Sequence, residues 1–132
     1  MSCLISSIHY CPVKSLSYQS LNSCNIKKNL GIINDRAFAF SRGIDLDKAK
    51  LIENNPNERK LNHLLTLKNS PSLNKYNFEY KNDELSLIKN DKKLISISIN
   101  NLEEHSNLSN KLIELESSLL KPIFLLKNQP LP

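Results

Sequence analysis

The chain has 132 residues, of which 39% are hydrophobic and 23% are charged. This length and composition are typical of one folded domain that buries its own core, and they exclude a disordered chain. The net charge of +5 would suit a polyanionic partner, but the lysines are spread along the chain instead of forming a stripe. We therefore expect no nucleic-acid partner.

The sequence shows no pattern for membrane insertion, secretion or cysteine-based stabilisation. No apolar run reaches the roughly 18 residues of a membrane helix, and the N-terminal MSCLISSIHY lacks the basic region and cleavage site of a secretion signal. Cys3, Cys11 and Cys24 have no C-x-x-C spacing, so neither a metal site nor disulfides are expected. These features predict a cytoplasmic protein with no membrane partner.

The first part of the chain has the pattern of short strands. Residues 3–13 and 20–28 predict two of them, and Pro12 restricts the first to an edge or terminal position. The stretch RAFAFSR, residues 36–42, alternates strictly and predicts a third strand. One face of that strand is expected to carry Arg36, Phe38, Phe40 and Arg42.

A polar segment separates these strands from the next ones. Residues 44–62 predict a long loop with one helical turn near 46–52, and loops of this length in compact domains are usually functional. The apolar segment HLLTL, residues 63–67, follows it.

The clearest pattern is a run of three β-patterned segments, YNFEY, ELSLIK and KLISISI. Asn82-Asp83 and Asn90-Asp91 join them, and these side chains favour tight turns. The run therefore predicts a β-meander with one buried face. In its last strand the side chains expected in the core are Ile95, Ile97 and Ile99.

The period then changes to that of an amphipathic helix over residues 101–120. Asn101 can cap its start, Glu104 stands in the capping-box position, and Pro122 stops it. A final strand is expected over 123–127. This order of elements predicts an α+β fold with a curled antiparallel sheet or a small barrel. The leucines on the helical stripe are Leu102, Leu108, Leu112, Leu115 and Leu119.

Catalytic motifs are absent from the sequence. It contains no G-x-S-x-G and no H-E-x-x-H, and its two glycines are too few for a glycine-rich phosphate loop. The three histidines, at positions 9, 63 and 105, lie far apart. We assign no catalytic residue to this chain.

Cations and a hydroxyl lie at the ends of the predicted strands, as Lys14, Ser15, Arg36 and Arg42. Lysine supplies a compact charge, serine a hydroxyl donor, and arginine a planar fork that binds two oxygens, which is the mixture that a phosphate needs. Basic residues at strand ends also keep sheet edges soluble. From the residues alone, an anion site and ordinary solvated strand ends are both open.

The stretches YCPVKSL and GIINDRAFAFSRG resemble the N-terminal β-barrel domain of MOSC proteins. These molybdenum-cofactor proteins are related to the C-terminal part of the molybdenum cofactor sulfurase and to the mitochondrial amidoxime-reducing component. The family pattern is P-V-K-[SG] after a first strand, then G-x-x-x-D-R before an aromatic-containing strand. The matching residues are Pro12, Val13, Lys14, Ser15, Gly31, Asp35, Arg36, Phe38 and Phe40.

The resemblance implies a molybdopterin cofactor in a basic cleft between this domain and a MOSC domain that follows it. By resemblance, Lys14, Ser15 and Arg36 contact the anionic cofactor, and Arg42 and Lys60 are further candidates. The molybdenum ligand is a cysteine of the MOSC domain. It is therefore not assigned to the cysteines of this chain.

The chain departs from the family in three ways. Cys11 stands where an aromatic residue is common, and Asn34 replaces the usual glycine before D-R, although Asn tolerates left-handed backbone angles. Residues 1–132 are expected to be a single MOSC N-terminal-type domain, since the sequence ends in KNQPLP about where the MOSC domain should begin.

The leading hypothesis is therefore an N-terminal domain that supplies the Lys/Ser/Arg part of a molybdenum-cofactor cleft. The complete protein would carry out oxygen-atom or sulfur transfer, such as reduction of N-hydroxylated compounds. Without the other wall of the cleft we expect neither catalysis nor tight cofactor binding. The expected partner is a MOSC domain, in the same chain or in another one.

The alternative hypothesis is a non-catalytic domain that binds a protein or forms a homo-oligomer. Exposed apolar side chains at Phe38, Phe40 and IFLL, residues 123–126, would favour it. A third possibility, a barrel that binds nucleic acid, predicts strongly salt-dependent binding, and the aromatic content of 6% leaves few residues to stack on bases.

Overall fold

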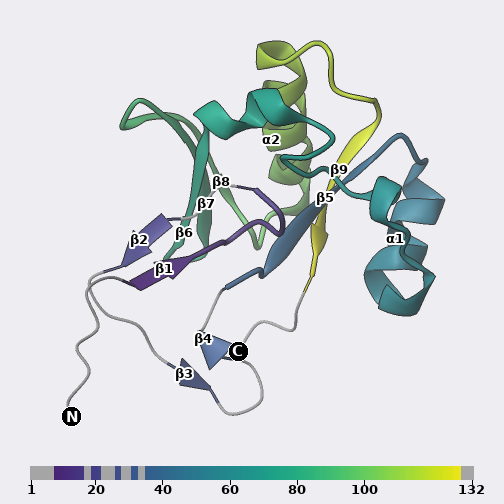
Figure 1. Ribbon diagram of the computed structural model, residues 1–132, viewed down its shortest axis with the longest axis horizontal. Coiled ribbons are helices and arrows are strands. Elements are labelled where there is room, and N and C mark those ends of the chain that lie inside the picture. Colours follow the sequence, from purple (N-terminus) through teal and green to yellow (C-terminus); the bar gives the residue numbers. More distant parts are fainter. Residues whose placement is uncertain (1–7, 17–18, 22–25, 28–30, 33–34, 129–132) are drawn as a thin grey trace.

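The computed structural model describes residues 8–16, 19–21, 26–27, 31–32 and 35–128. They form an α+β fold, as predicted, in which two α-helices pack against short strands (Figure 1). The strands are β1 (Ile8–Tyr10), β2 (Gln19–Leu21), β3 (Ile26–Lys27), β4 (Gly31–Ile32), β5 (Phe38–Arg42), β6 (Asn77–Lys81), β7 (Glu84–Lys89), β8 (Lys92–Ser98) and β9 (Ile123–Lys127). The helices are α1 (Leu46–Asn54) and α2 (Leu102–Leu115), and 3-10 turns lie at Pro56–Glu58, Leu61–His63 and Pro71–Lys75.

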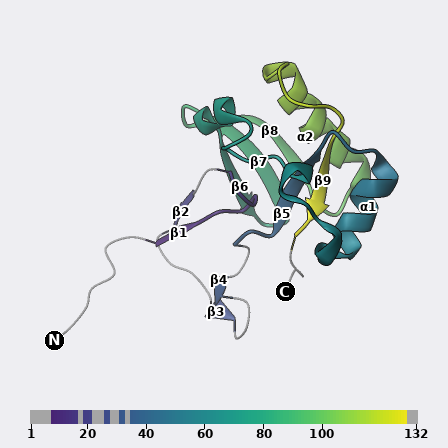
Figure 2. The same ribbon diagram turned by 45° about the vertical axis from the view of Figure 1, so that its right-hand side comes forward.

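The strands form small antiparallel sheets. β1 pairs with β2, β3 with β4 and β5 with β9, and β6, β7 and β8 form the meander. In the part of the chain that the structure describes, these curled sheets do not close into a barrel, so the open curled form is the one found. Helix α2 contacts both β8 and β9 and thereby bridges the meander and the β5–β9 pair (Figures 1 and 2).

The meander confirms the turn prediction. Lys81 pairs with Glu84 and Lys89 with Lys92, so each joint is a two-residue turn. All four turn residues have positive φ, between 52° and 63°, as a type I′ turn requires. Asn and Asp tolerate this region better than most residues, which explains why the sequence pattern located these turns. The residues concerned are Asn82, Asp83, Asn90 and Asp91.

Helix α2 begins where predicted but ends at Leu115, before the predicted end at 120. Asn101 caps it by accepting a hydrogen bond from the Glu103 amide at 3.1 Å. The Glu104 carboxylate accepts instead from the amide of Ser98 at 3.1 Å, so the helix has no capping box. Leu102 is 72% exposed, because the buried stripe starts only at Leu108.

One correction applies between β5 and the meander. The region expected to hold one helical turn contains the nine-residue helix α1. Asp45 caps this helix, because its side chain accepts a hydrogen bond from the Lys48 amide at 2.8 Å. The apolar segment at 63–67 is joined to β5 by an isolated bridge between Leu64 and Ser41. Leu65 donates a further backbone hydrogen bond to Phe40, which ties this segment to the edge of β5.

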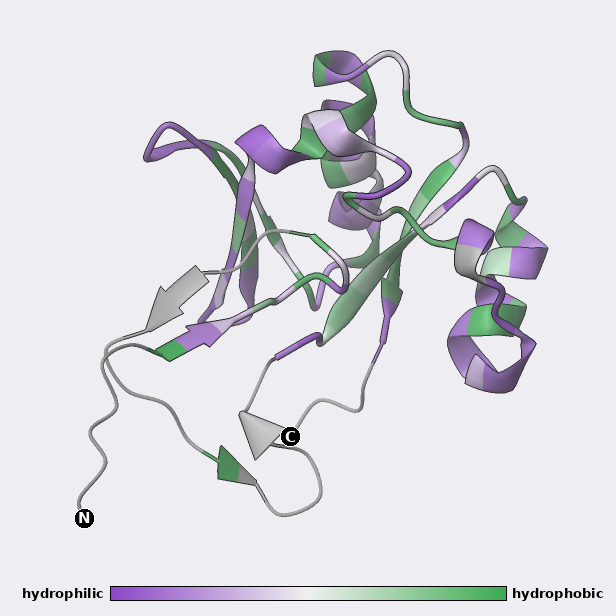
Figure 3. Cartoon of the chain, in the orientation of Figure 1, coloured by the Kyte–Doolittle hydropathy of each residue, from purple (hydrophilic) through white to green (hydrophobic). Residues whose placement is uncertain are grey.

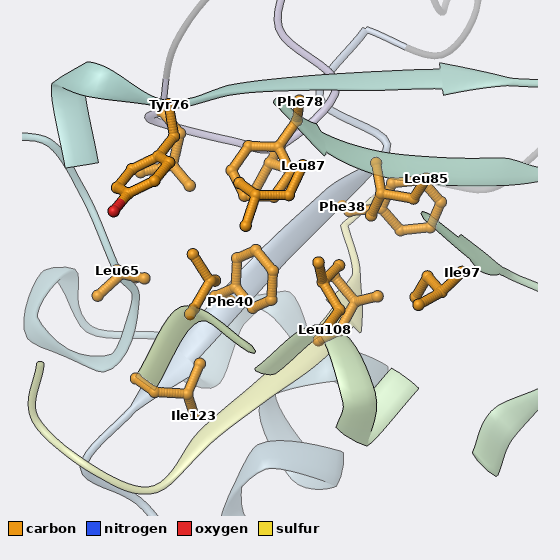
Figure 4. Packing of buried hydrophobic residues seen from close by; sticks show 14 of the residues in the cluster. Phe38, Phe40, Leu65, Tyr76, Phe78, Leu85, Leu87, Ile97, Leu108 and Ile123 are labelled. Carbon is orange, nitrogen blue, oxygen red and sulfur yellow. The ribbon is translucent and has the colours of Figure 1, made fainter. Parts of the chain in front are cut away.

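The core lies on both faces of β5. Phe40 packs on Phe78 with ring centroids 5.7 Å apart (Figure 4). Phe38 meets Tyr80 edge to face, with ring centroids 5.0 Å apart. On the other face, Ala39 belongs to a second apolar cluster under α1. The hydropathy colouring shows the β5–β9 pair as mainly hydrophobic and the meander turn at Asn90-Asp91 as hydrophilic (Figure 3).

This burial removes one argument for the interaction-domain alternative. Phe38 and Phe40 are buried, as are Ile123, Leu125 and Leu126. Of the IFLL segment only Phe124 is partly exposed. The exposure that would have favoured a binding surface there is therefore not found. Among the described residues no helix is long and apolar enough to cross a membrane.

The N-terminal strands are described only in part. β1 lies within the strand predicted over 3–13, and both β2 and β3 overlap the single strand predicted over 20–28. Residues 3–7, 22–25 and 28 lie outside the described residues. Tyr10 links β1 to the meander, because its hydroxyl donates to the carbonyl of Tyr80 at 3.2 Å and accepts from the Tyr80 amide at 3.1 Å.

Candidate functional site

The two motif segments of the sequence lie side by side along β5. Phe38 donates a backbone hydrogen bond to Pro12 at 3.0 Å, and Lys14 donates one to Phe38 at 2.7 Å. Val13 and Phe38 form a parallel bridge, and the Arg36 amide donates to Cys11 at 2.5 Å. The structure thus brings together two segments whose paired residues are about 25 positions apart in the sequence.

Asp35 and Cys11 hold these segments in place. The Asp35 carboxylate accepts a hydrogen bond from the buried Cys11 amide at 2.8 Å. The Cys11 thiol lies under the following turn and donates toward the carbonyls of Val13 and Leu16, at 2.8 and 3.3 Å. Burial raises the pKa of this thiol, so it stays protonated and serves packing, not nucleophilic chemistry.

Ser15 and Arg36 have a backbone conformation that their residue types rarely adopt. Their φ angles are 63° and 52°, and apart from the Asn and Asp residues of the meander turns they are the only non-glycine residues with positive φ among those described. This region costs an ordinary residue about 1–2 kcal/mol. Such conformations persist where surrounding contacts impose them, and they cluster at functional sites.

Arg36 is an exposed side chain that is already paired. Its guanidinium forms an ion pair with Asp35, and 45% of the side chain is exposed. Its backbone carbonyl accepts a hydrogen bond from Nδ2 of Asn128 at 2.7 Å. Asn128 in turn accepts from the Arg59 guanidinium at 2.5 Å, and Arg59 Nε donates to Ile52 at 2.8 Å.

Arg59 and Asn128 were not among the residues singled out from the sequence. Both lie far from position 36 in the chain, and no motif includes them. Their contacts fix the backbone at Arg36 from the end of β9 and from α1. Desolvation lowers the pKa of Arg59, and its second terminal nitrogen is buried without a hydrogen-bond partner.

Ser15 and Arg42 meet at a different place, in a pocket of about 650 Å³. Arg42 Nε donates to the backbone carbonyl of Asn62 at 3.2 Å, which fixes the guanidinium at the wall of the pocket. Its terminal nitrogens have no partner among the described residues. The residues that line the pocket are Ser15, Arg42, Asn62, Thr66, Leu67, Lys68 and Asn69.

The turn on the far side of this pocket adds a cation, Lys68, that sequence reasoning missed. Asn69 stabilises the turn: its side chain accepts from the Thr66 amide at 3.0 Å and donates to Leu64 at 2.9 Å, while its own amide donates to the Thr66 hydroxyl at 3.1 Å. The Leu67 amide donates to Ser15 and joins the turn to the motif. No carboxylate of the described chain lines this pocket.

The predicted site residues therefore fall into two groups along β5. Ser15 and Arg42 share the pocket, whereas Arg36 does not line it and pairs with Asp35 instead. Lys14 precedes Ser15 in the chain but does not line the pocket, and its ammonium has no partner among the described residues. Lys60 does not line the pocket.

Metal ligands are not gathered in the described part of the chain: no group of three His, Cys, Asp or Glu side chains there could hold an ion. His63 is buried and its Nδ1 accepts from the Lys60 amide at 3.1 Å, and desolvation lowers its pKa. His105 lies against the carbonyl of Ile99 at 2.9 Å. Both are packed histidines.

Comparisons of the chain with family models, with curated proteins and with solved structures found no match.

Proposed function

We propose that this chain is an N-terminal domain of the MOSC type, which contributes the cationic part of a cleft for molybdenum cofactor. One observation carries the proposal. The P-V-K-S and D-R segments are paired along β5, and each holds one residue, Ser15 or Arg36, in a left-handed conformation that tertiary contacts impose. These are residues that the family resemblance assigns to the cofactor.

The donors in the described pocket fit the phosphate of a pterin cofactor. A phosphate needs cationic and hydroxyl donors and is repelled by carboxylates. Ser15, Arg42 and Lys68 supply such donors, and no described carboxylate lines the pocket. Lys14 is the residue before Ser15, and its ammonium has no ionic partner in the described part of the chain. Arg36 would have to exchange its Asp35 partner for the ligand, or bind it with the guanidinium nitrogens that Asp35 leaves free.

In this proposal the cofactor, when bound, supplies the molybdenum centre for oxygen-atom or sulfur transfer. The residues of this chain bind and orient the anionic end. The metal ligand comes from a MOSC domain, in the same chain or in a partner. The same proposal assigns the protein to the cytoplasm. Alone, this chain is expected to bind the cofactor weakly and to have no reductase activity, so turnover by the isolated 132-residue chain would refute that part of the proposal.

Calorimetric titration of the full chain with molybdopterin tests the proposal. We expect weak but saturable binding, and Arg42→Gln should weaken it about tenfold or more, because a hydrogen bond to a charged group contributes about 1.5–3 kcal/mol. Arg42→Lys keeps the charge and should restore part of the affinity.

Lys92→Gln is the matched control, since Lys92 is an exposed cation at the tip of the meander and does not line the pocket described above. It should leave binding unchanged. Equal losses in Arg42→Gln and Lys92→Gln would show attraction to net positive charge only. That result, or no saturable binding by the unaltered chain, contradicts the proposal.

A further inference from the structure

A groove lies at the outer edge of β9, away from the anion pocket. Helix α1 packs on one face of the β5–β9 pair and α2 on the other, so the edge of β9 is left between the two helices (Figures 1 and 2). Two adjoining hollows, of about 500 and 320 Å³, share Lys50, Leu102 and His105 together with Leu125 and Leu126 of β9.

The edge of β9 presents backbone groups to this groove. The backbone amide of Asn128 donates to the carbonyl of Ala37, and the amide of Gly43 donates to the carbonyl of Pro122. In this alternating register, the backbone amides and carbonyls of Leu126 and Phe124 are the ones that point toward β5. The amides of Leu125 and Lys127 therefore point outward. The Glu53 carboxylate accepts a hydrogen bond from the Lys127 amide at 2.8 Å. No described strand pairs with the amide and carbonyl of Leu125.

Apolar side chains stand at the rims of the groove. Leu46 at the start of α1 is 51% exposed and Leu102 at the start of α2 is 72% exposed, and both line the smaller hollow. Phe124, partly exposed, lies in the same hollow. A chain that ran along β9 would direct alternate side chains toward Leu46 and toward Leu102.

The charges of the groove favour an acidic occupant. Its lining contains Lys50 and Lys127, with His105, against one carboxylate, Glu53. Both oxygens of Glu53 are engaged, one with the Lys50 ammonium at 3.7 Å and the other with the Lys127 amide. The Lys127 ammonium has no ionic partner among the described residues. A ligand carboxylate would therefore meet an unpaired cation here.

We propose that this groove binds an extended segment of a partner protein, apolar at alternate positions and carrying acidic residues, which adds to β9 as a further strand. The Leu125 amide and carbonyl supply main-chain hydrogen bonds, Leu46 and Leu102 supply apolar contacts, and Lys127 pairs with an acid. This is the physics of strand addition to an open sheet edge. The inference is independent of the proposed cofactor site.

The probe is a short synthetic peptide of alternating valine and threonine with a glutamate at each end, added to the isotope-labelled full chain. We expect amide shift changes concentrated on residues 123–127 and on the facing sides of α1 and α2. The same peptide with alternate amides N-methylated should bind at least about tenfold more weakly, because it loses the main-chain hydrogen bonds. A peptide with lysine in place of glutamate should also bind more weakly.

Protein variants complete the test. Leu46→Asn and Leu102→Asn, at exposed positions, should leave stability within about 0.5 kcal/mol and each weaken peptide binding several-fold. Leu51→Asn, at a side chain 42% exposed on α1 that lines neither hollow, is the matched control and should change nothing. Binding that is insensitive to N-methylation, shift changes elsewhere, or no binding overturns the proposal. Dimerisation in sedimentation that Leu102→Asn abolishes would show that a second copy, not an acidic segment, occupies the groove.

Discussion

Left-handed residues occur in two regions of this molecule for different reasons. In the meander, the four are Asn or Asp at two-residue turns, where local chemistry favours the conformation. In the proposed site they are Ser15 and Arg36, whose types do not favour it. There the conformation is imposed by distant partners, such as the bond from Asn128 to the Arg36 carbonyl. Local preference shapes the meander, and tertiary contacts shape the site.

The largest effect is expected where the two regions meet. Phe38 anchors the motif segments in the core through its edge-to-face contact with Tyr80 of the meander. Phe38→Ala should lower the free energy of unfolding by about 3–5 kcal/mol, because it removes a buried ring and leaves a cavity. Denaturant unfolding measures this. Leu120→Ala, at a side chain 53% exposed, should change it by less than about 0.5 kcal/mol, and equal losses would contradict this role of Phe38.

The second effect concerns the contact that imposes the site geometry. Asp35→Ala leaves the buried Cys11 amide without an acceptor and should cost about 1–3 kcal/mol of unfolding free energy. Asp35→Asn keeps an acceptor oxygen and should cost less. If both variants cost the same, the charge of Asp35, and not its hydrogen bond to Cys11, holds the segments together.

The same two regions differ in how far the sequence alone predicts their structure. The meander, β9 and the class of fold follow from alternation and turn chemistry within short windows. The bond of Asn128 to Arg36, the turn that brings Lys68 to Ser15, and the length of α1 depend on packing between distant segments. No local pattern encodes such contacts, so the resemblance could name Ser15 but not its neighbour Lys68.

A smaller effect is expected outside both regions, at Glu116, which follows the last residue of α2. It is buried and accepts hydrogen bonds from the Lys75 ammonium at 2.7 Å and the Tyr76 hydroxyl at 3.0 Å. The bond with Lys75 is the main reason that the pKa of Glu116 lies below its usual 4.5. This contribution to stability is therefore present above pH 4.5 and is lost as the pH falls through the lower pKa of the folded protein.

Unfolding measured from neutral pH down to acid tests this assignment. Glu116→Gln should be less stable than the unaltered chain at neutral pH, and the difference should shrink as the pH falls below 4.5. A constant difference across that range would show that Glu116 contributes through packing and not through its charge.

The smallest effects compare the two kinds of left-handed residue directly. Ser15→Gly and Asp91→Gly should each raise the free energy of unfolding by up to about 1 kcal/mol, because glycine accepts positive φ without the cost of a Cβ. Only Ser15→Gly should weaken phosphate binding, since it removes a pocket hydroxyl. Loss of binding in Asp91→Gly, or none in Ser15→Gly, would show that the pocket does not bind the anion.

The most direct test of the cofactor proposal is a map of amide chemical-shift changes as molybdopterin is added to the labelled chain. The account predicts saturable changes that cluster at positions 14–15, 36, 42 and 66–69, with the meander tips at 82–83 and 90–91 unaffected. Changes spread over the exposed lysines, or confined to the edge of β9, would contradict it.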